Sequence, residues 1–464
     1  MPAPDFDYST MLSGQRMRRR SALRIGCGAA GLTLPQYLQT HAATAASNGS
    51  AKSCIVLFCW GGMSHIDTFD PKPKAPANVR GEFKPIDTAT PGIHIGEHTP
   101  RLAKLTDHLA IIRSMHHDCT SHGKGMYWNM TGHPPPAPAA AVNLPPSRGD
   151  WPSLAAMVSS FRKAAPGMPP SVRLPYPLVD NGTLQAGESA GWLGVAHDPI
   201  VIRTPKGKAY GGVSRDLGSP VLDLSDGIDR PHLRSRRKLL ESIEQPVGGN
   251  ATVKSFAHFQ QLALDMLATP EVTAAFDLDR EPKQMHDAYG EHICGQSVLL
   301  ARRLSGAGVP IVTVVCAAGD LNGSAGDHWD THGNNFNRLK NDMLPPFDRA
   351  ASALITDLDQ RGKLEETLVV MMGDFGRTPK INGGAGRDHY PYSFSVALAG
   401  GGIRGGQVYG SSDKIGAFPH NLPCGPGDVH ATIFEAMGIS PDSLLYDNLR
   451  RPHKICKGSP LPLT

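Results

Sequence analysis

Aromatic residues are scarce in this chain of 464 residues, and its cysteines form no metal-binding pair. Only 6% of the residues are Phe, Trp or Tyr, and the eight cysteines include no Cys-x-x-Cys. We therefore expect neither a disulfide framework nor a zinc-thiolate site. Zinc-finger spacings and RNA-binding signatures are also missing, and 46 basic residues nearly balance 42 acidic ones, for a net charge of +4. This composition argues against a nucleic-acid partner.

Glycine and proline, by contrast, are abundant. The chain has 51 glycines and 40 prolines, about a fifth of its residues, against roughly 12% in an average protein. With 40% hydrophobic residues the chain is globular, and the excess of Gly and Pro predicts long loops that carry a site. The 20 histidines, several of them beside aspartates, are the first indication of metal chemistry.

The N-terminal segment has the features of an export signal. Arg19-Arg20, followed by Ser-Ala-Leu, fits the twin-arginine (Tat) pattern. A weakly apolar stretch over 25–38 and the small residues at 43–45 complete the signal and its cleavage site. We predict a Tat signal peptide over residues 1–45 and a mature protein in the periplasm or at the cell surface. No later stretch reaches ~18 uninterrupted apolar residues, so no membrane span is expected after signal removal.

The mature chain alternates between predicted strands and helices. Continuous apolar runs, typical of strands buried on both faces of a sheet, occur at 53–60, 110–113, 309–315 and 367–372. Helices are predicted at 123–130, at 285–304, after Pro345, and in a final helix capped by Asp428. This alternation predicts an α/β sandwich with a mainly parallel sheet. Residues 46–464 are expected to form a single domain with a Gly- and Pro-rich insertion at about 133–230.

Aspartate and histidine residues follow four of the predicted strands. Sites in open α/β sheets lie beyond the carboxyl ends of the strands, so we expect these side chains to meet at one edge. Carboxylates and imidazoles together suit a divalent cation, either zinc, manganese, magnesium or calcium. The candidate metal ligands are Asp67, Asp330, His332, Asp374, Asp388 and His389.

A second set of candidates lies around the start of the helix predicted at 123–130. Backbone N–H groups at a helix N-terminus bind anions, so Thr120 or Ser121 is either a nucleophile or merely the N-cap. His122 is a candidate general acid or base. Candidate groups for holding an anionic substrate are Lys124, Arg377 and Arg387.

Several stretches carry a resemblance to a known family. They are 61–72, Ser121-His122 with Thr131-Gly132, 329–332, 373–379, 387–389 and 400–406. Over about residues 50–460 the chain resembles the bacterial family called domain of unknown function 1501. That family is similar to the alkaline phosphatase and sulfatase superfamily, in which metal-bound nucleophiles cleave phosphate or sulfate esters. The resemblance implies an alkaline-phosphatase-like α/β/α sandwich with a mainly parallel central sheet.

The chain departs from the superfamily pattern at three positions. Gly61-Gly62 stands where the superfamily has a metal-binding aspartate, and Phe375 stands where it has a histidine. Counting nine residues back from Thr131, to the superfamily's nucleophile position, reaches His122. Together with the predicted signal peptide, the resemblance implies an exported metal-dependent hydrolase of phosphate or sulfate esters, with glycan esters among the candidate substrates. The alternative is a non-catalytic exported protein that binds anionic, sulfated or phosphorylated glycans, and a third possibility is a mutase.

Overall fold

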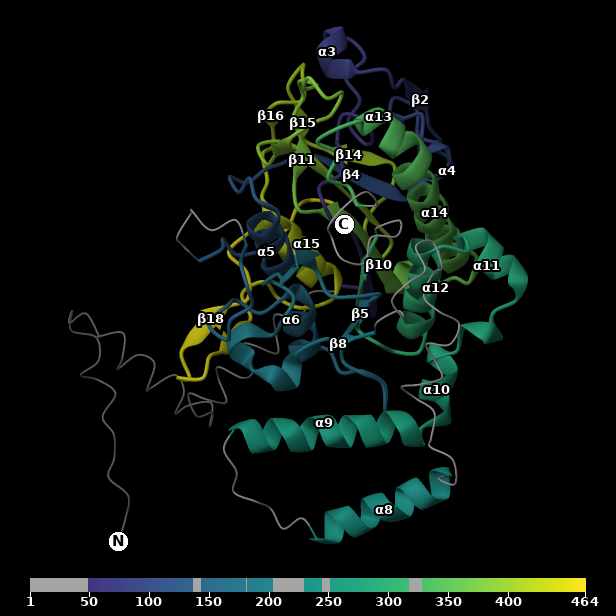
Figure 1. The fold of residues 1–464 in the computed structure, drawn as a ribbon, viewed down its shortest axis with the longest axis vertical. Helices are drawn as coiled ribbons and strands as arrows, with labels where there is room; N and C mark the ends of the chain where they lie inside the picture. The colour runs from purple at the N-terminus through teal and green to yellow at the C-terminus, as the bar shows by residue number, and fades with distance from the viewer. Residues whose placement is uncertain (1–48, 137–142, 181, 203–228, 244–250, 317–327) are drawn as a thin grey trace, which may run out of the picture. The chain divides into compact units, whose positions relative to one another are not determined.

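An eight-stranded sheet forms the centre of the protein, in a computed structural model that describes residues 49–136, 143–180, 182–202, 229–243, 251–316 and 328–464 (Figure 1). Every strand of this sheet except β13 runs in the same direction. The predicted α/β class with a mainly parallel sheet is therefore confirmed. In spatial order the strands are β14 (Gln407–Tyr409), β4 (Leu109–Met115), β13 (Phe394–Ala399), β10 (Thr367–Gly373), β1 (Ser53–Cys59), β9 (Ile311–Val315), β5 (Val172–Leu174) and β8 (Ile200–Val201).

Helices cover both faces of this sheet, which explains why β1 is apolar throughout. Ile55 and Leu57 belong to one hydrophobic core, with α12 (Ile293–Gly306) and α14 (Leu344–Gln360). Val56 and Phe58 belong to a second core on the other face, with α5 (His122–Thr131), α6 (Leu154–Phe161) and α15 (Pro426–Ala436). Successive side chains of a strand point to opposite faces, so a strand between two cores needs an unbroken apolar run. Figure 1 shows the two groups of helices on opposite sides of the sheet.

Shorter elements surround this core. The other α-helices of the described residues are α3 (Ala77–Arg80), α4 (Pro100–Ala103), α8 (Arg230–Ile243), α9 (Ala251–Ala268), α10 (Pro270–Phe276), α11 (Lys283–Tyr289) and α13 (Asn335–Arg338). Two-stranded ribbons are formed by β2 (Pro85–Asp87) with β3 (His94–Gly96), β6 (Val179–Asp180) with β7 (Thr183–Leu184), β11 (Gly376–Arg377) with β12 (His389–Tyr390), β15 (Ser411–Ser412) with β16 (Pro419–Asn421), and β17 (Leu444–Tyr446) with β18 (Pro452–Lys454). Within the described part of the chain, no helix has the length and apolar character needed to cross a bilayer.

Two regions of the sequence analysis fall partly or wholly outside the described residues. The predicted signal peptide, residues 1–45, lies outside them, and so do residues 137–142, 181 and 203–228 of the predicted insertion. The described part of that insertion supplies α6 and two strands of the central sheet, β5 and β8.

The structure corrects two helix predictions. The helix predicted over 285–304 is two helices, α11 and α12, because the backbone at Gly290 has a positive φ of 96° and ends α11. The final helix has Gly425 as its N-cap rather than Asp428. Asp428 instead lies in the first turn, where its Oδ2 accepts a hydrogen bond of 2.9 Å from the backbone N–H of Gly425. Asp428 therefore still stabilises the N-terminus of this helix, as the acidic residue of a capping box.

The break at Gly290 gives a first stability prediction. A Cβ at this position would lie 2.3 Å from His292 Nε2, in a backbone conformation that L-residues rarely adopt. We expect Gly290→Ala to lower the free energy of unfolding by about 1–3 kcal/mol, measured by urea denaturation. Gly306→Ala is the matched control, because a Cβ at this helical glycine meets nothing within 4 Å. The control should raise stability by about 0.4–1 kcal/mol, and equal effects of the two changes would contradict the explanation.

The sheet order brings the predicted site segments together. β1 lies between β9 and β10, and its last residue, Cys59, is paired with Gly373 at the end of β10. Phe58 is paired with Val315 at the end of β9. The segments that follow these strands therefore leave the sheet at the same edge, where ligands bind in open α/β folds.

Candidate metal centre

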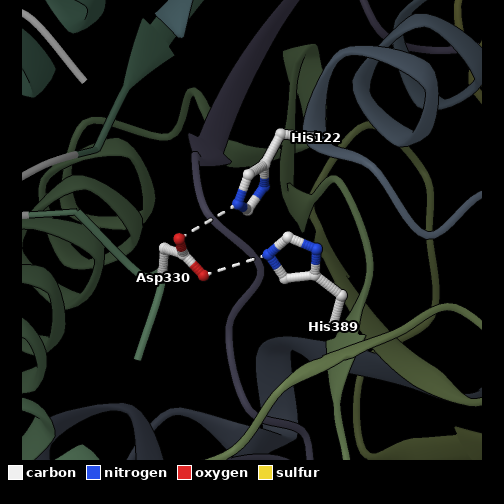
Figure 2. A group of neighbouring side chains, drawn as sticks. All are labelled: His122, Asp330 and His389. Atoms are coloured by element: carbon white, nitrogen blue, oxygen red, sulfur yellow. Dashed lines mark hydrogen bonds and ion pairs between the residues drawn. The ribbon is translucent and has the colours of Figure 1, made fainter. Parts of the chain in front are cut away.

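Three side chains from distant segments meet at this edge of the sheet. His122 begins α5, His389 begins β12, and Asp330 lies in the segment between β9 and α13. Their potential ligand atoms all lie within 4.8 Å of one another. Figure 2 shows both imidazoles directed at the Asp330 carboxylate, with His122 Nε2 3.2 Å from Oδ2 and His389 Nε2 3.2 Å from Oδ1.

The far side of each imidazole is held by a hydrogen-bond acceptor. His122 Nδ1 donates to Asp374 Oδ2 at 2.5 Å, and His389 Nδ1 donates to the backbone carbonyl of Thr120 at 2.7 Å. If a cation replaces the proton on Nε2, the proton on Nδ1 remains and the lone pair of Nε2 faces the cation. Metal-binding histidines are typically oriented in this way, by a carboxylate or a carbonyl on the nitrogen that does not bind the metal.

A third imidazole borders the group. His332 Nδ1 donates to Asp388 Oδ1 at 2.7 Å, and its Nε2 lies 3.1 Å from Asp330 Oδ1. The same Nε2 lies 2.9 Å from His389 Nε2. Two imidazole lone pairs at this separation repel unless a proton or a cation lies between them. The pair therefore either shares an additional proton or has a cation as a common partner.

Charge and burial set the protonation of the group. Burial alone would lower the pKa of His122, but Asp374 and Asp330 raise it to about 9. Burial alone would raise the pKa of Asp330, yet the three imidazoles and the Arg377 guanidinium hold it well below its usual range. Burial lowers the pKa of His389. The centre is thus a buried, acidic environment that favours a bound positive charge.

The residues present fit a divalent cation. His122 Nε2 is buried without a hydrogen-bond partner, since its approach to Asp330 lacks the alignment of a hydrogen bond. An unsatisfied nitrogen of this kind beside a carboxylate is costly unless a proton or an ion completes it. Two imidazoles and a carboxylate are a donor set that divalent metals use in proteins.

Two predicted site residues bind each other instead. Arg387 donates from Nε and NH2 to the two carboxylate oxygens of Asp67, at 2.8 and 3.1 Å, and both side chains are completely buried. Asp67 also accepts hydrogen bonds from Ser64 and Asn335, at 2.6 and 3.0 Å. The other Arg387 donors bind backbone carbonyls, among them that of Val79. The structure therefore places Asp67 and Arg387 in an internal ion pair.

Arg377 is also occupied within the protein. This fully buried side chain donates to the carbonyls of Gly61 and Gly62 and, at 2.5 Å, to Asp330 Oδ1. The glycine is required at position 61, where φ is 103° and a Cβ would lie 2.4 Å from the Asp330 backbone nitrogen. Its own N–H donates to Asp374 Oδ1 at 3.1 Å. The segment after β1 thus holds Asp374 and Arg377 through backbone hydrogen bonds. The superfamily pattern implies an aspartate side chain in this segment.

Phe375 forms one wall of the centre. Its buried ring stacks on His122, with centroids 5.1 Å apart, and packs against His389 at 4.7 Å. Trp60 lies against the His122 ring as well, at 5.1 Å. Phe375 therefore packs the two imidazoles in place and makes this side of the centre apolar.

The hydroxyl candidates lie directly beside His122. Ser121 is the N-cap residue of α5, but its side chain makes no capping hydrogen bond. Its Oγ is buried and has no hydrogen-bond partner among the described residues. Thr120 is exposed and contributes its carbonyl to His389. Lys124 is buried in the first turn of α5.

Two features of the centre were missed in the sequence. His122 was predicted as an acid or base, yet it lies among the metal-donor atoms. Asp180, at the end of β6, was not singled out, because it lies in a Gly- and Pro-rich stretch without periodicity. Burial raises the pKa of Asp180, and the charges of His122, Asp330 and Asp374 act on it. Asp180 therefore belongs to the surroundings of the centre.

Comparison with known proteins identifies the family. The family model described as protein of unknown function (DUF1501) matches residues 51–462. The chain belongs to the DUF1501 family. This confirms the family expected from the motifs. No curated protein matches this DUF1501 chain.

Solved structures similar to this DUF1501 protein include an alkaline phosphatase superfamily protein and a sulfatase. A protein in the alkaline phosphatase superfamily from Vibrio parahaemolyticus is 11% identical, with 90% of this chain and 71% of that chain covered and a TM-score of 0.40. The PsFucS1 sulfatase from Pseudoalteromonas sp. is 14% identical, with 87% and 70% covered and a TM-score of 0.35. Likeness at this level says nothing about the reaction.

Proposed function

We propose that the protein is an exported, metal-dependent hydrolase of phosphate or sulfate esters. The observation that carries this proposal is the convergence of His122, Asp330 and His389 at the carboxyl edge of the sheet. With His332 beside them, the donor set is richer in nitrogen than calcium or magnesium prefer, and it favours zinc. A divalent cation held there would polarise the ester and stabilise the charge that develops on its oxygens.

The chain's own residues would bind and orient the substrate. The backbone N–H groups in the first turn of α5 suit an anionic group. Ser121 Oγ, which is buried without a hydrogen-bond partner in the residue next to His122, is the proposed nucleophile for attack on phosphorus or sulfur. Asp374 and the Thr120 carbonyl fix the two imidazoles, and Phe375 excludes water from one side.

One observation favours the second candidate, a non-catalytic protein that binds anionic glycans. The cations predicted to hold the substrate, Arg377 and Arg387, direct their donors at backbone carbonyls and at Asp330 and Asp67. An ester hydrolase that lacks an arginine clamp must rely on the cation and on the helix N-terminus for charge stabilisation.

The deciding experiment combines metal analysis with Ser121→Ala. Protein purified without chelator should contain about one zinc per chain and hydrolyse an aryl phosphate or aryl sulfate. Ser121→Ala should keep the metal content and melting temperature, because the hydroxyl makes no capping bond. Its kcat should fall roughly a thousandfold or more, as expected for loss of a nucleophile. An active Ser121→Ala protein would reject the nucleophile, and a metal-loaded wild type that cleaves no ester would favour the binding protein.

Export is tested separately at the arginine pair. We expect Arg19→Lys combined with Arg20→Lys to block translocation, because the Tat export machinery recognises the two arginines. Immunoblotting of periplasmic and cytosolic fractions measures the effect, with Arg24→Lys as the control outside the pair. Periplasmic delivery of the double variant at the wild-type level would refute the Tat signal.

A further inference from the structure

Three aromatic rings gather at the surface next to β12, a group called here the aromatic surface. It consists of Tyr390, Tyr392 and Phe418, whose ring centroids are 5.2, 6.0 and 6.3 Å apart. Tyr392 is 41% exposed and Phe418 is 54% exposed. Such a cluster, in a chain with only 6% aromatic residues, marks a surface used for contact.

A basic groove lies beside the loop that carries Phe418, because its lining includes residues 412–415 and His420. The groove has a volume of about 880 Å³, and its lining includes Lys72, Lys74, Lys414 and His420. Neither Lys74 nor Lys414 forms an ion pair with any described residue. The one carboxylate of the lining, that of Asp413, accepts backbone hydrogen bonds from residues 415, 417 and 418. The groove therefore presents net positive charge toward solvent.

The loop over 412–420, which supplies Phe418 to the aromatic surface and Lys414 and His420 to the groove, is held by hydrogen bonds. Asp413 N–H donates to the Phe418 carbonyl at 2.8 Å and closes the loop. Buried His65 bonds through Nε2 to the Gly416 carbonyl at 2.8 Å, and Ser412 donates to Asp70. A surface fixed in this way loses little conformational entropy when it binds a partner.

The aromatic surface is separate from the metal centre. Tyr390 directly follows His389 in β12, and neighbouring side chains of a strand point to opposite faces. The His389 ring packs against His332 and Phe375, whereas the Tyr390 ring packs against Tyr392 and Phe418. A ligand on the aromatic surface therefore lies on the other side of the β11–β12 ribbon from the centre.

We propose that the aromatic surface and the basic groove together form a docking surface for an acidic polysaccharide. Sugar rings present C–H faces that pack on exposed aromatic rings, and regularly spaced sulfate or carboxylate groups would pair with Lys74 and Lys414. A single-stranded nucleic acid matches less well, because stacked bases need rings that lie roughly parallel. The three ring pairs here are inclined at 79°, 62° and 40°.

The test measures binding of the full chain to a heparin-type sulfated polysaccharide by calorimetry. Phe418→Ala and the pair Lys74→Ala with Lys414→Ala should each weaken binding by about tenfold, and added salt should weaken the wild type. The matched controls are Tyr446→Ala, an aromatic residue 58% exposed on β17, and Lys104→Ala, an exposed lysine at the end of α4. Both should bind as the wild type does. The substituted side chains are exposed, so melting temperatures should not change.

Three outcomes would overturn the proposal. They are unchanged binding by the groove and ring variants, equal binding of the chemically desulfated polymer, and tighter binding of an oligothymidylate of similar length. Asp330→Asn, a change in the metal centre, should bind the polysaccharide as the wild type does. A wild type that hydrolyses no ester but binds the polysaccharide would therefore reject the proposed function and leave this inference standing.

Discussion

Replacing Asp330 with Asn should abolish the proposed metal binding and, with it, the proposed ester hydrolysis. The Asp330 carboxylate lies within 3.2 Å of three imidazoles, those of His122, His332 and His389, and it also accepts from Arg377. Asp374 pairs with His122 and Asp388 pairs with His332, whereas Asp330 pairs with all three rings, so its negative charge is central to the site. Loss of residues that only orient a ligand costs about 10–100-fold in metal affinity. We therefore expect Asp330→Asn to lower zinc affinity by more than ~100-fold, measured by competition with a chromogenic chelator.

Asp388→Asn is the matched control for this prediction. Asp388 is half exposed and orients only His332 within the centre, through a hydrogen bond of 2.7 Å. Its replacement should weaken metal binding by about tenfold, as for other residues that orient a ligand. If the two variants bind metal as tightly as the wild type does, the ligand set is wrong.

Breaking the internal ion pair between Asp67 and Arg387 should give the largest loss of stability. Both side chains are completely buried, and two N–H donors of Arg387 meet the two oxygens of Asp67. Arg387→Met leaves the Asp67 carboxylate buried without its cation, which costs about 3–5 kcal/mol when one partner of a buried pair is removed. The measurement is the free energy of unfolding from urea denaturation, with metal content followed in parallel.

Lys454→Met is the control, because it removes one partner of an exposed pair. Lys454 and Asp442 are 2.6 Å apart, with 61% and 79% of their side chains exposed. Loss of this pair should cost about 0–1 kcal/mol. Equal costs for Arg387→Met and Lys454→Met would show that the buried pair does not stabilise the fold. Loss of metal from folded Arg387→Met protein would show that this ion pair also positions the metal centre.

The central strands of the sheet could be predicted from the sequence. β1, β9 and β10 are unbroken apolar runs. A strand that is covered on both faces needs such a run, and this requirement does not depend on which strands lie beside it. The polar segments after these strands were correctly expected at one edge, because parallel strands all end on the same side. Helix ends were predicted less accurately than strands where one residue sets the boundary. At Gly290, a positive φ divides a continuous apolar stripe into two helices.

The positions of Asp and His after the strands predict most of the residues at this edge of the sheet, but only long-range packing sets what each of them contacts. Asp67 and Asp330 both follow buried strands, and nothing local distinguishes them. Asp67 meets Arg387, 320 residues later in the chain, whereas Asp330 meets three imidazoles from α5, β12 and its own segment. His122 faces Asp330 because its other nitrogen is held by Asp374, from the end of β10. Such pairings depend on long-range packing, since the energy of a buried charge is set by the groups that surround it in space.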